Sequence, residues 1–564
     1  MDKRTIIGFL VILLILFLWP QWNKLFYKQV EPPPNQQVQE QAESADTVIQ
    51  PQKQPAVIAP ATVSAEKQLA LAALPSQPEK LITFENEDVI AVLSSHGGLI
   101  KSVKLKRYYI ENGDNGDSLV QMMPTPDLNP WPVMGALTLS DEDDILPINN
   151  FSFETASSDI RLAKGDDPQT ISFAYTDSSG ASVRKDYTFN PEGYNIGLRL
   201  KIDNPAALGF NKQLTLGWLV PNVPSEKDYS KDLDKFGEFY YAGDFVDIDD
   251  VNEKTRFDTP GGDTRWVANR SKYFTNVILA EGDPGSAALL ASSKTDIFDH
   301  EGKKHNWEQY GVGLTFNLKS NTFENNFLIY SGPLDYYRLE KIGYNLSKLV
   351  DMGWKGFRPF AIGILWVFRQ LHSILYNYGI VIIVFSILMK IIFWPLTRKS
   401  STAMMKMKEL QPKMQEVKEK FKNEPQKMNA ETMKLYKEYG VNPFGSCLPI
   451  LVQLPIFWAM FSVLNNSIEL RAAGFAFWIT DLSQKDPYYV LVIIMGLAMF
   501  VQQKMTITDP KQKMLVYIMP VVFTFLFASW PSGLVLYWAM FSIIGIFEQL
   551  IIKKRLEEEK AITS

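Results

Sequence analysis

The sequence predicts a polytopic α-helical membrane protein with six spans that also carries a large exported domain built of β-strands. Long apolar runs occupy about the last 210 of its 564 residues, and short alternating strands fill about residues 81–339. Positive charge is concentrated beside the apolar runs, which is typical of membrane topology. The net charge of -5 gives no global nucleic-acid signature, so no DNA partner is expected.

Residues 1–27 are expected to form an N-terminal transmembrane anchor. Lys3 and Arg4 precede the apolar run Ile6–Trp19 and should remain in the cytoplasm by the positive-inside bias. The run is as short as a signal-peptide core, so a cleaved signal is the alternative. No small-residue cleavage site follows it directly, and Trp22 and Phe26 extend an aromatic band, which favours the anchor.

Residues 28–80 form the predicted linker. Its composition is rich in Pro, Gln, Ala and Ser, and its clearest stretch is EPPPNQQVQEQ. Such a segment cannot bury enough apolar surface to fold, so an extended chain is expected.

Residues 81–340 are predicted to form a large β-sandwich of even-spaced strands. Examples of the strands are ISFAYTD (171–177), YNIGLRLKID (194–203), KQLTLGWLV (212–220) and NTFENNFLIYSGP (321–333). Turn signals between strands are His96-Gly97-Gly98, Asn112-Gly113, Ser179-Gly180 and Pro260-Gly261-Gly262. No Lys-Ser or Lys-Thr pair follows these glycines in the pattern of a phosphate loop, so they are interpreted as turns.

Residues 341–377 are expected to hold a linker and an interfacial amphipathic helix. Apolar side chains within 359–376 surround Arg369 and His372, a mixture that suits a helix lying on the membrane surface. The alternative is a helix buried against protein before the next span, and the sequence does not separate the two.

Five further apolar segments lie in residues 378–552, and each is long enough, or nearly so, to cross the hydrocarbon as a helix. They are Tyr378–Leu396, Phe444–Leu464, Pro487–Val501, Met514–Trp530 and Gly533–Ile552. Arg398–Val441 carries 11 Lys or Arg against 6 Asp or Glu, and the tail 553–564 opens with two Lys and one Arg. Placing these charges in the cytoplasm gives six spans, two cytoplasmic termini and an exported β-domain.

Lys390 is the most informative residue of this region. It lies eight positions before Arg398 in the run GIVIIVFSILMKIIFWPLTRK, roughly 12 Å inside the cytoplasmic boundary at 1.5 Å per residue. A charge at span depth costs about 2.5–3.5 kcal/mol. We therefore expect Lys390 to face a hydrated cavity or a partner, with Ser386 one helical turn before it. Snorkelling toward the headgroups is the alternative.

Other predicted spans supply polar or aromatic side chains that could line an inward-open groove. These are Gln453, Gln502, Gln503, Trp538 and Glu548. Such side chains can also simply join helices in lipid. Glu548 is placed near the cytoplasmic end of its span, and no acidic residue is expected at mid-membrane, which weakens a proton-relay function.

The segment 398–441 is predicted to form a cytoplasmic hairpin of two amphipathic helices, the first started or kinked by Pro412. One apolar face recurs at spacings of three and four: Met404, Met407, Leu410, Met414, Val417 and Phe421. A second follows Pro425: Met428, Thr432, Leu435 and Tyr439. The methionines suit contact with varied partners. The alternative is that this face packs on the bundle or on lipid.

The sequence offers no sign of covalent or metal chemistry. Cys447 stands alone in an apolar run and is interpreted as a packing residue. No HExxH motif and no Cys/His cluster is present, so no catalytic residue, metal site or cofactor is expected.

The carboxy-terminal part resembles the YidC membrane protein insertase family, with its Oxa and Alb relatives. The matching stretches are WPLTRKSSTAMMKMKELQPKMQEVKEKF, YKEYGVNPFGSCLPILVQLPIFWAMF, FAFWITDLSQKDPYYVLVIIMG and FASWPSGLVLYWAMFSIIGIFEQ. The anchor, linker and β-domain are similar to the Gram-negative bacterial branch, whose periplasmic domain is a β-supersandwich similar to sugar mutarotases.

The resemblance implies that residues 378–552 are a five-span insertase core with a hydrophilic groove open to cytoplasm and lipid. Family members usually carry an arginine where this chain has Lys390, so the charge is kept and the planar fork is lost. Gln503 and Trp538 match groove positions, and Ser386 and Gln453 complete the expected groove. The hairpin Met404–Tyr439 corresponds to the family's substrate-receiving hairpin.

The resemblance also implies a non-enzymatic insertase and chaperone in the bacterial inner membrane. Its expected partners are nascent membrane proteins, the Sec translocon with accessory subunits, the ribosome transiently and the lipid bilayer. A client's exported tail would enter the groove, where water and Lys390 lower the cost of desolvating its polar groups. The apolar segment would then partition into lipid, since no ATP site is apparent.

Two other functions are considered. A secondary transporter or channel needs inverted repeats and broken spans, and no convincing repeat is found. An enzyme acting on sugars through the exported domain needs acid–base residues in a cleft, for which His96, His300 and His305 are candidates. Solute uptake tests the first, and deletion of the β-domain tests the second.

Overall fold

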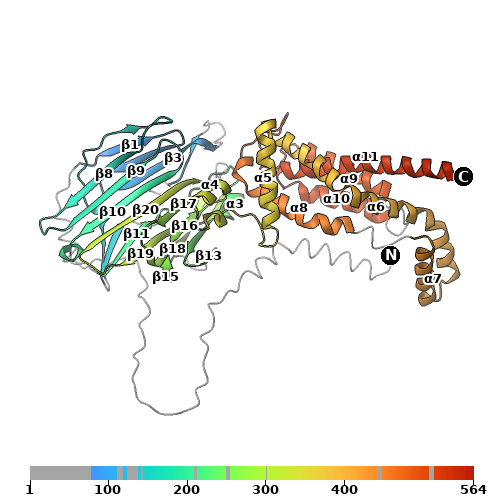
Figure 1. The fold of residues 1–564 in the computed structure, drawn as a ribbon, viewed down its shortest axis with the longest axis horizontal. Coiled ribbons are helices and arrows are strands. Elements are labelled where there is room, and N and C mark those ends of the chain that lie inside the picture. Colours follow the sequence, from blue (N-terminus) through green and yellow to red (C-terminus); the bar gives the residue numbers. More distant parts are fainter. Residues whose placement is uncertain are drawn as a thin grey trace, which may run out of the picture. The chain divides into compact units, whose positions relative to one another are not determined.

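The computed structural model describes residues 78–110, 118–123, 137–141, 144–208, 212–248, 255–299, 302–440, 448–506 and 513–563 (Figure 1). The predicted anchor 1–27, nearly all of the predicted linker 28–80, and Cys447 lie outside these ranges. The chain divides into two compact units. One holds the β-strands and ends at Asp351, with Asn466–Glu469 added, and the other holds Met352–Asn465 and Leu470–Ser564.

The β-unit contains three sheets among the described residues. The first is ordered β4 (Ser118–Gln121), β3 (Leu99–Ile110), β2 (Val89–Ser94), β1 (Leu81–Glu85) and β7 (Ile160–Arg161). The second is ordered β13 (Phe245–Ile248), β12 (Gly237–Tyr241), β16 (Trp266–Arg270), β17 (Phe274–Ala280), β20 (Thr322–Pro333), β10 (Asn195–Asp203), β9 (Ser182–Phe189) and β8 (Gln169–Thr176). The third is ordered β14 (Thr255–Asp258), β18 (Gly285–Phe298), β19 (Lys304–Asn317), β11 (Gln213–Trp218), β5 (Leu137–Asp141) and β6 (Asp144–Pro147), and β15 (Gly261–Thr264) pairs with β18.

Alternation of apolar and polar residues explains why these segments form strands. In β10, Ile196, Leu198 and Leu200 are buried, and Arg199 between them is exposed. The four segments proposed as strands from the sequence coincide with β8, β10, β11 and β20. All pairings are antiparallel except that of β1 with β7.

Some of the turns predicted from the sequence are present in the structure, and one is not. Gly97 and Gly98 have φ of 73° and 54° in the turn between β2 and β3, as expected, and Gly180 has φ 83°. The turn expected at Pro260-Gly261-Gly262 is wrong, because Gly261 begins β15 and pairs with Ala287 before the register shifts. A strand glycine at a register irregularity has no side chain to pack, which made it resemble a turn in the sequence. Asn112-Gly113 lies outside the described residues.

A buried lysine lies beneath the turn after β2. Lys185 on β9 is 2% exposed, and its Nζ donates to the carbonyl of Gly97 at 2.6 Å. The hydroxyl of Tyr187 donates to the carbonyl of Gly98 at 2.9 Å. Burial lowers the pKa of Lys185 to about 7, because desolvation penalises the ammonium.

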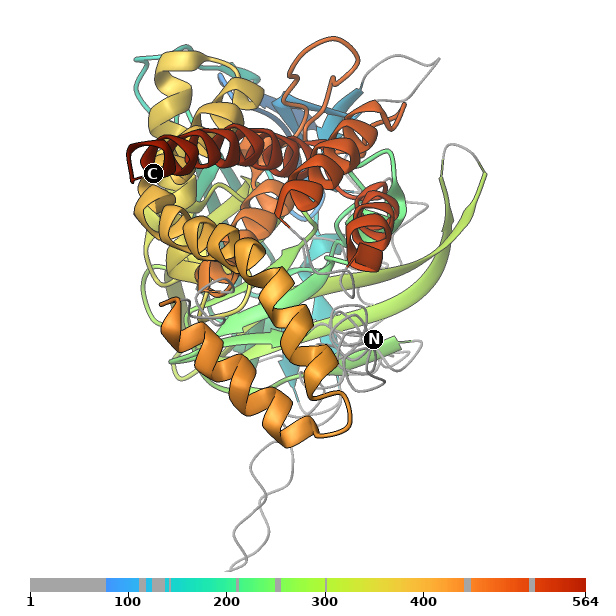
Figure 2. The same cartoon turned by 90° about the vertical axis from the view of Figure 1, so that its right-hand side faces the viewer.

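The second unit is helical (Figures 1 and 2). Its helices are α5 (Arg358–Leu375), α6 (Tyr378–Lys420), α7 (Pro425–Glu438), α8 (Leu448–Asn466), α9 (Val490–Thr506), α10 (Lys513–Phe527) and α11 (Ser532–Thr563). Helix α11 packs against α6 and α9, and α9 packs against α10. The short helices α3 (Tyr229–Leu233) and α4 (Tyr336–Ile342) belong to the β-unit.

The five apolar segments of the core all contain helix. Tyr378–Ala403 and Ser532–Arg555 are long and apolar enough to cross a membrane by length and composition, and Val490–Met505 and Val516–Phe527 are shorter apolar helices. The described structure therefore gives two candidate spans, and the count of six stays a prediction.

Helix α6 differs from the expectation for the hairpin. It runs without interruption from the first candidate span into the cytoplasmic segment, with Pro395 and Pro412 inside it. Pro412 therefore does not start a separate helix. A helix can continue through proline when the lost hydrogen bond is offset by packing, and Leu410, only 3% exposed, lies one turn or less away.

Helix α5 has Pro359 in its first turn and ends at Leu375, and the capping residue Tyr376 has a left-handed φ of 53°. One apolar face is buried and includes Phe368, whose ring lies 5.2 Å from that of Phe385 on α6. A second apolar stripe is exposed: Phe360 at 51%, Trp366 at 55% and Ile374 at 71%. The helix thus packs one apolar face against the protein and leaves a second apolar face exposed.

Candidate functional site

Helices α6 and α11 bring one lysine and one glutamate together. The Nζ of Lys390 lies 3.3 Å from Oε2 of Glu548, and their side chains are 8% and 6% exposed. Each charge alone would be costly at this burial, and the pair with its hydrogen bond compensates both. Lys390 therefore has a partner, which is one of the two environments expected for it from the sequence.

Two further side chains complete the surroundings of the pair. The hydroxyl of Thr397, two turns after Lys390 on α6, donates to Oε1 of Glu548. The Nζ of Lys390 lies 3.7 Å from the centre of the Phe541 ring, a cation–π position. Both carboxylate oxygens of Glu548 are thus engaged from α6.

Gly545 allows the helices to approach one another at this place. A Cβ added to it would lie 2.3 Å from Nε2 of Gln502 on α9 and 3.2 Å from Nζ of Lys390. Phe541, Gly545 and Glu548 follow one another at spacings of four and three, so they share one face of α11. The polar site is therefore a three-helix contact of α6, α9 and α11.

Ser386 and Gln503 lie near this contact in sequence, and their side chains differ in their hydrogen bonds. Ser386 is fully buried and donates to the carbonyl of Ile382 in its own helix at 2.7 Å, so its hydroxyl is turned to backbone. Oε1 of Gln503 is buried and has no hydrogen-bond partner among the described residues.

Trp538 and Gln453 belong to a different environment. The ring of Trp538 contacts Phe457, Phe523 and Phe527 at centroid distances of 5.2, 6.1 and 5.6 Å. Gln453 forms a side-chain hydrogen bond with Tyr537. Trp538 thus lies in an aromatic cluster of α8, α10 and α11. Within the described structure, Gln453 is linked to the Lys390 contact only indirectly, because the ring of Tyr537 lies 6.0 Å from that of Phe541.

The hairpin places its two predicted faces within a helix pair. Met407, Met414, Val417 and Phe421 are half-buried, while Pro412 and Lys413 are exposed. Met428, Thr432 and Leu435 on α7 are also half-buried, and α7 folds back beside the end of α6 (Figure 2). The side chain of Met404 lies outside the description. Part of the apolar face is therefore used inside the hairpin.

Sequence reasoning missed Thr397, Phe541 and Gly545. It named Glu548 among the side chains that could line the groove, but it did not pair Glu548 with Lys390. The usable signal was the spacing of aromatic, glycine and acid on one face of an apolar helix, since glycine marks close helix approach. The partner of Lys390 still required the tertiary arrangement, because the two residues are 158 positions apart.

The described residues offer little for covalent chemistry. Within them, no group of three or more His, Cys, Asp or Glu side chains is placed to hold a metal ion. His305 pairs with Asp299 at 2.7 Å on the β-unit, and His300 lies outside the description. The arrangement at Lys390 can compensate charge and exchange hydrogen bonds at span depth.

Comparisons with known proteins match nearly the whole chain. The family described as YidC periplasmic domain matches residues 81–367, and the family described as 60Kd inner membrane protein matches residues 370–560. A protein of Geotalea daltonii named membrane protein insertase YidC is 35% identical, covering 99% of this chain and 100% of its own. One of the same name from Syntrophus aciditrophicus is 33% identical, covering 98% and 100%. A solved active YidC insertase has a TM-score of 0.36 and 18% identity, covering 86% of this chain and 96% of its own.

Proposed function

The chain belongs to the YidC family of membrane protein insertases, and we propose that its clients pass into the bilayer beside the Lys390–Glu548 pair. The observation that carries the proposal is this pair, which places two compensated charges between two candidate membrane spans. Intramembrane ionisable residues usually mark a functional path.

The proposed topology has six spans, with both termini in the cytoplasm and the β-unit in the periplasm. It is supported by the excess of Lys and Arg in 398–441 and at Lys553, Lys554 and Arg555. The anchor 1–27 supplies the first span, and the helices α6, α8, α9, α10 and α11 supply the others. The exposed stripe on α5 would then lie in the interface of the periplasmic leaflet.

The pairing changes the expected role of Lys390. Because Glu548 compensates its charge, simple attraction of an acidic client by a free cation is weak. A client carboxylate or polar tail would instead replace Glu548 at Lys390, while Thr397 continues to hold Glu548. In this exchange Lys390 gains a new partner and Glu548 keeps its hydrogen bond from Thr397. Glu548 loses its counter-charge, a free-energy cost that burial of the client's apolar segment in lipid must offset.

The remaining groups act before and after the exchange. The hairpin of α6 and α7 would receive the nascent client, transiently with its ribosome. The client's path would then be lined or bordered by Ser386, Gln453, Gln503 and Trp538. The client's apolar segment then partitions into lipid, driven by its own burial. The insertase would act alone or with the Sec translocon and its accessory subunits.

Reconstitution tests this function directly. The purified full chain in liposomes should protect the short exported tail of a single-span client from protease, whereas liposomes without it should not. Failure of the wild-type chain with every short-tailed client would contradict autonomous insertion. Sugar turnover or solute uptake by the same liposomes would instead favour the enzyme or transporter.

A further inference from the structure

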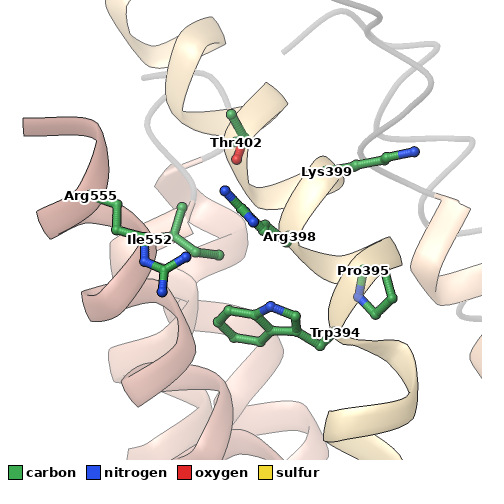
Figure 3. Close-up of a pocket in the computed structure, with 7 residues that line it drawn as sticks. All are labelled: Trp394, Pro395, Arg398, Lys399, Thr402, Ile552 and Arg555. Carbon is green, nitrogen blue, oxygen red and sulfur yellow. The ribbon is translucent and has the colours of Figure 1, made fainter. Parts of the chain in front are cut away.

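A second polar feature lies between α6 and α11, beyond the ion pair. It is a cavity of about 530 Å³ to which α6 contributes Trp394, Arg398 and Thr402, and α11 contributes Ile552 and Arg555 (Figure 3). The candidate spans of these helices end at Ala403 and Arg555. The cavity therefore lies at the ends of both spans, on the side that the charge distribution assigns to the cytoplasm.

Two arginines give the cavity its chemistry. The guanidinium groups of Arg398 and Arg555 both point into the space between the helices (Figure 3). Lys399 also lines the cavity, and its ammonium end extends away from the two guanidinium groups. Neither arginine has an ion pair with a side chain that the structure describes. Lys553 and Lys554 beside them are paired with Glu557 and Glu558. Two guanidinium forks directed at one space match the oxygens of a phosphate group.

The other walls of the cavity indicate what carries the phosphate. The indole of Trp394 lies below the two guanidinium groups, and Ile552 is 3% exposed beside them (Figure 3). A free phosphate or a nucleic-acid backbone would gain nothing from this apolar floor, whereas a lipid has acyl chains next to its headgroup. Basic pockets between spans on the cytoplasmic side favour acidic lipids.

We propose that this cavity binds the headgroup of an anionic phospholipid from the cytoplasmic leaflet. Arg398 and Arg555 hold the phosphate from the two helices, and Trp394 and Ile552 contact the start of the acyl chains. The placement in that leaflet rests on the proposed topology. The bound lipid would tie together the ends of the two helices that also hold Lys390 and Glu548.

The test measures lipid binding by the full chain in detergent, not insertion, so its failure is distinguishable from failure of the proposed function. Native mass spectrometry with added phosphatidylglycerol should show binding that the double variant Arg398→Gln/Arg555→Gln weakens about tenfold, since two charge-assisted hydrogen-bond groups are lost. The matched control Lys553→Gln/Lys554→Gln removes the same charge outside the cavity and should bind nearly as the wild type does. Equal loss in both variants, or no loss in the first, would overturn the proposal.

Two further measurements test whether the bound phosphate belongs to a lipid and whether that lipid lies at Trp394. Inorganic phosphate should compete weakly with the lipid, and competition as strong as that of phosphatidylglycerol itself would show a plain anion site instead. Phosphatidylglycerol with brominated acyl chains should quench the tryptophan fluorescence of the wild-type chain. The Trp394→Phe variant should lack the part of this quenching that comes from Trp394. Equal quenching by brominated phosphatidylcholine would contradict selectivity for an anionic headgroup.

Discussion

The Nζ of Lys390 lies 3.3 Å from the carboxylate of Glu548, across 158 positions of sequence. Neither side chain is more than 8% exposed, so each is the main compensation for the other's charge. In the proposed function the charge at position 390 passes from this internal partner to an incoming one, and the pairing itself has measurable consequences.

Removing the charge of Lys390 or of Glu548 alone should lower the free energy of unfolding more than removing both charges. Lys390→Gln or Glu548→Gln leaves one buried charge uncompensated, which should lower the free energy of unfolding by about 3 kcal/mol. The double variant should lose less than the sum of the two, because no charge remains. Thermal unfolding of the purified chain in detergent measures this cycle, and additive losses would show that the two groups do not interact.

Gly545 should be intolerant of even a methyl group. Gly545→Ala places a Cβ 2.3 Å from the amide of Gln502, so the contact of α9 and α11 must open. We expect a stability loss of about 1–3 kcal/mol, as for overpacking, and recovery in Gly545→Ala/Gln502→Ala. The control is Gly363→Ala on α5, where the added Cβ meets nothing within 4 Å and helix propensity predicts a gain of up to about 1 kcal/mol. Similar losses at both glycines would refute the close approach.

Several features of the structure follow from local sequence patterns, and others do not. The alternation of Ile196, Leu198 and Leu200 predicts β10, because strand burial has a period of two. Continuation of α6 through Pro412 could not be predicted, since it depends on packing that offsets a local penalty. Lys390 was recognised from its depth, but its partner depends on how distant helices meet.

Lys185 shows the same limit within the β-unit. A lysine in an alternating strand is usually solvent-exposed, and only the tertiary contact with the carbonyl of Gly97 allows its burial. Its consequence is a dependence of stability on pH that the sequence alone would not suggest.

That dependence has a definite sign. The pKa of Lys185 falls from 10.5 in the unfolded chain to about 7 in the folded one. Between these values the unfolded chain binds more protons, so the free energy of unfolding should rise with pH, by about 2 kcal/mol from pH 7 to pH 9. Loss of the β-sheet circular dichroism signal on heating measures it. Lys185→Met should remove this part of the slope, whereas Lys104→Met, at an exposed strand position, should keep it. An unchanged slope in Lys185→Met would contradict the assignment.

The hairpin should depend on its buried face. Leu410 is 3% exposed on α6, so Leu410→Asp buries an unpaired charge and should loosen the pairing of α6 with α7. Limited proteolysis should then cut faster in the connection at residues 421–424. Met433→Asp is the matched control, because Met433 is 48% exposed on α7 and should change the cleavage rate little. Equal rates in the two variants would argue against a packed hairpin.

The most direct test of the insertion path is site-directed photocrosslinking to a ribosome-stalled, short-tailed client. A photoreactive residue at position 503, next to Gln502 at the polar contact, should crosslink the client strongly. The same residue at position 525, where Phe525 is 85% exposed on α10, should crosslink it weakly. Weak crosslinking at 503 together with strong crosslinking at 525 would contradict passage of clients beside Lys390 and Glu548.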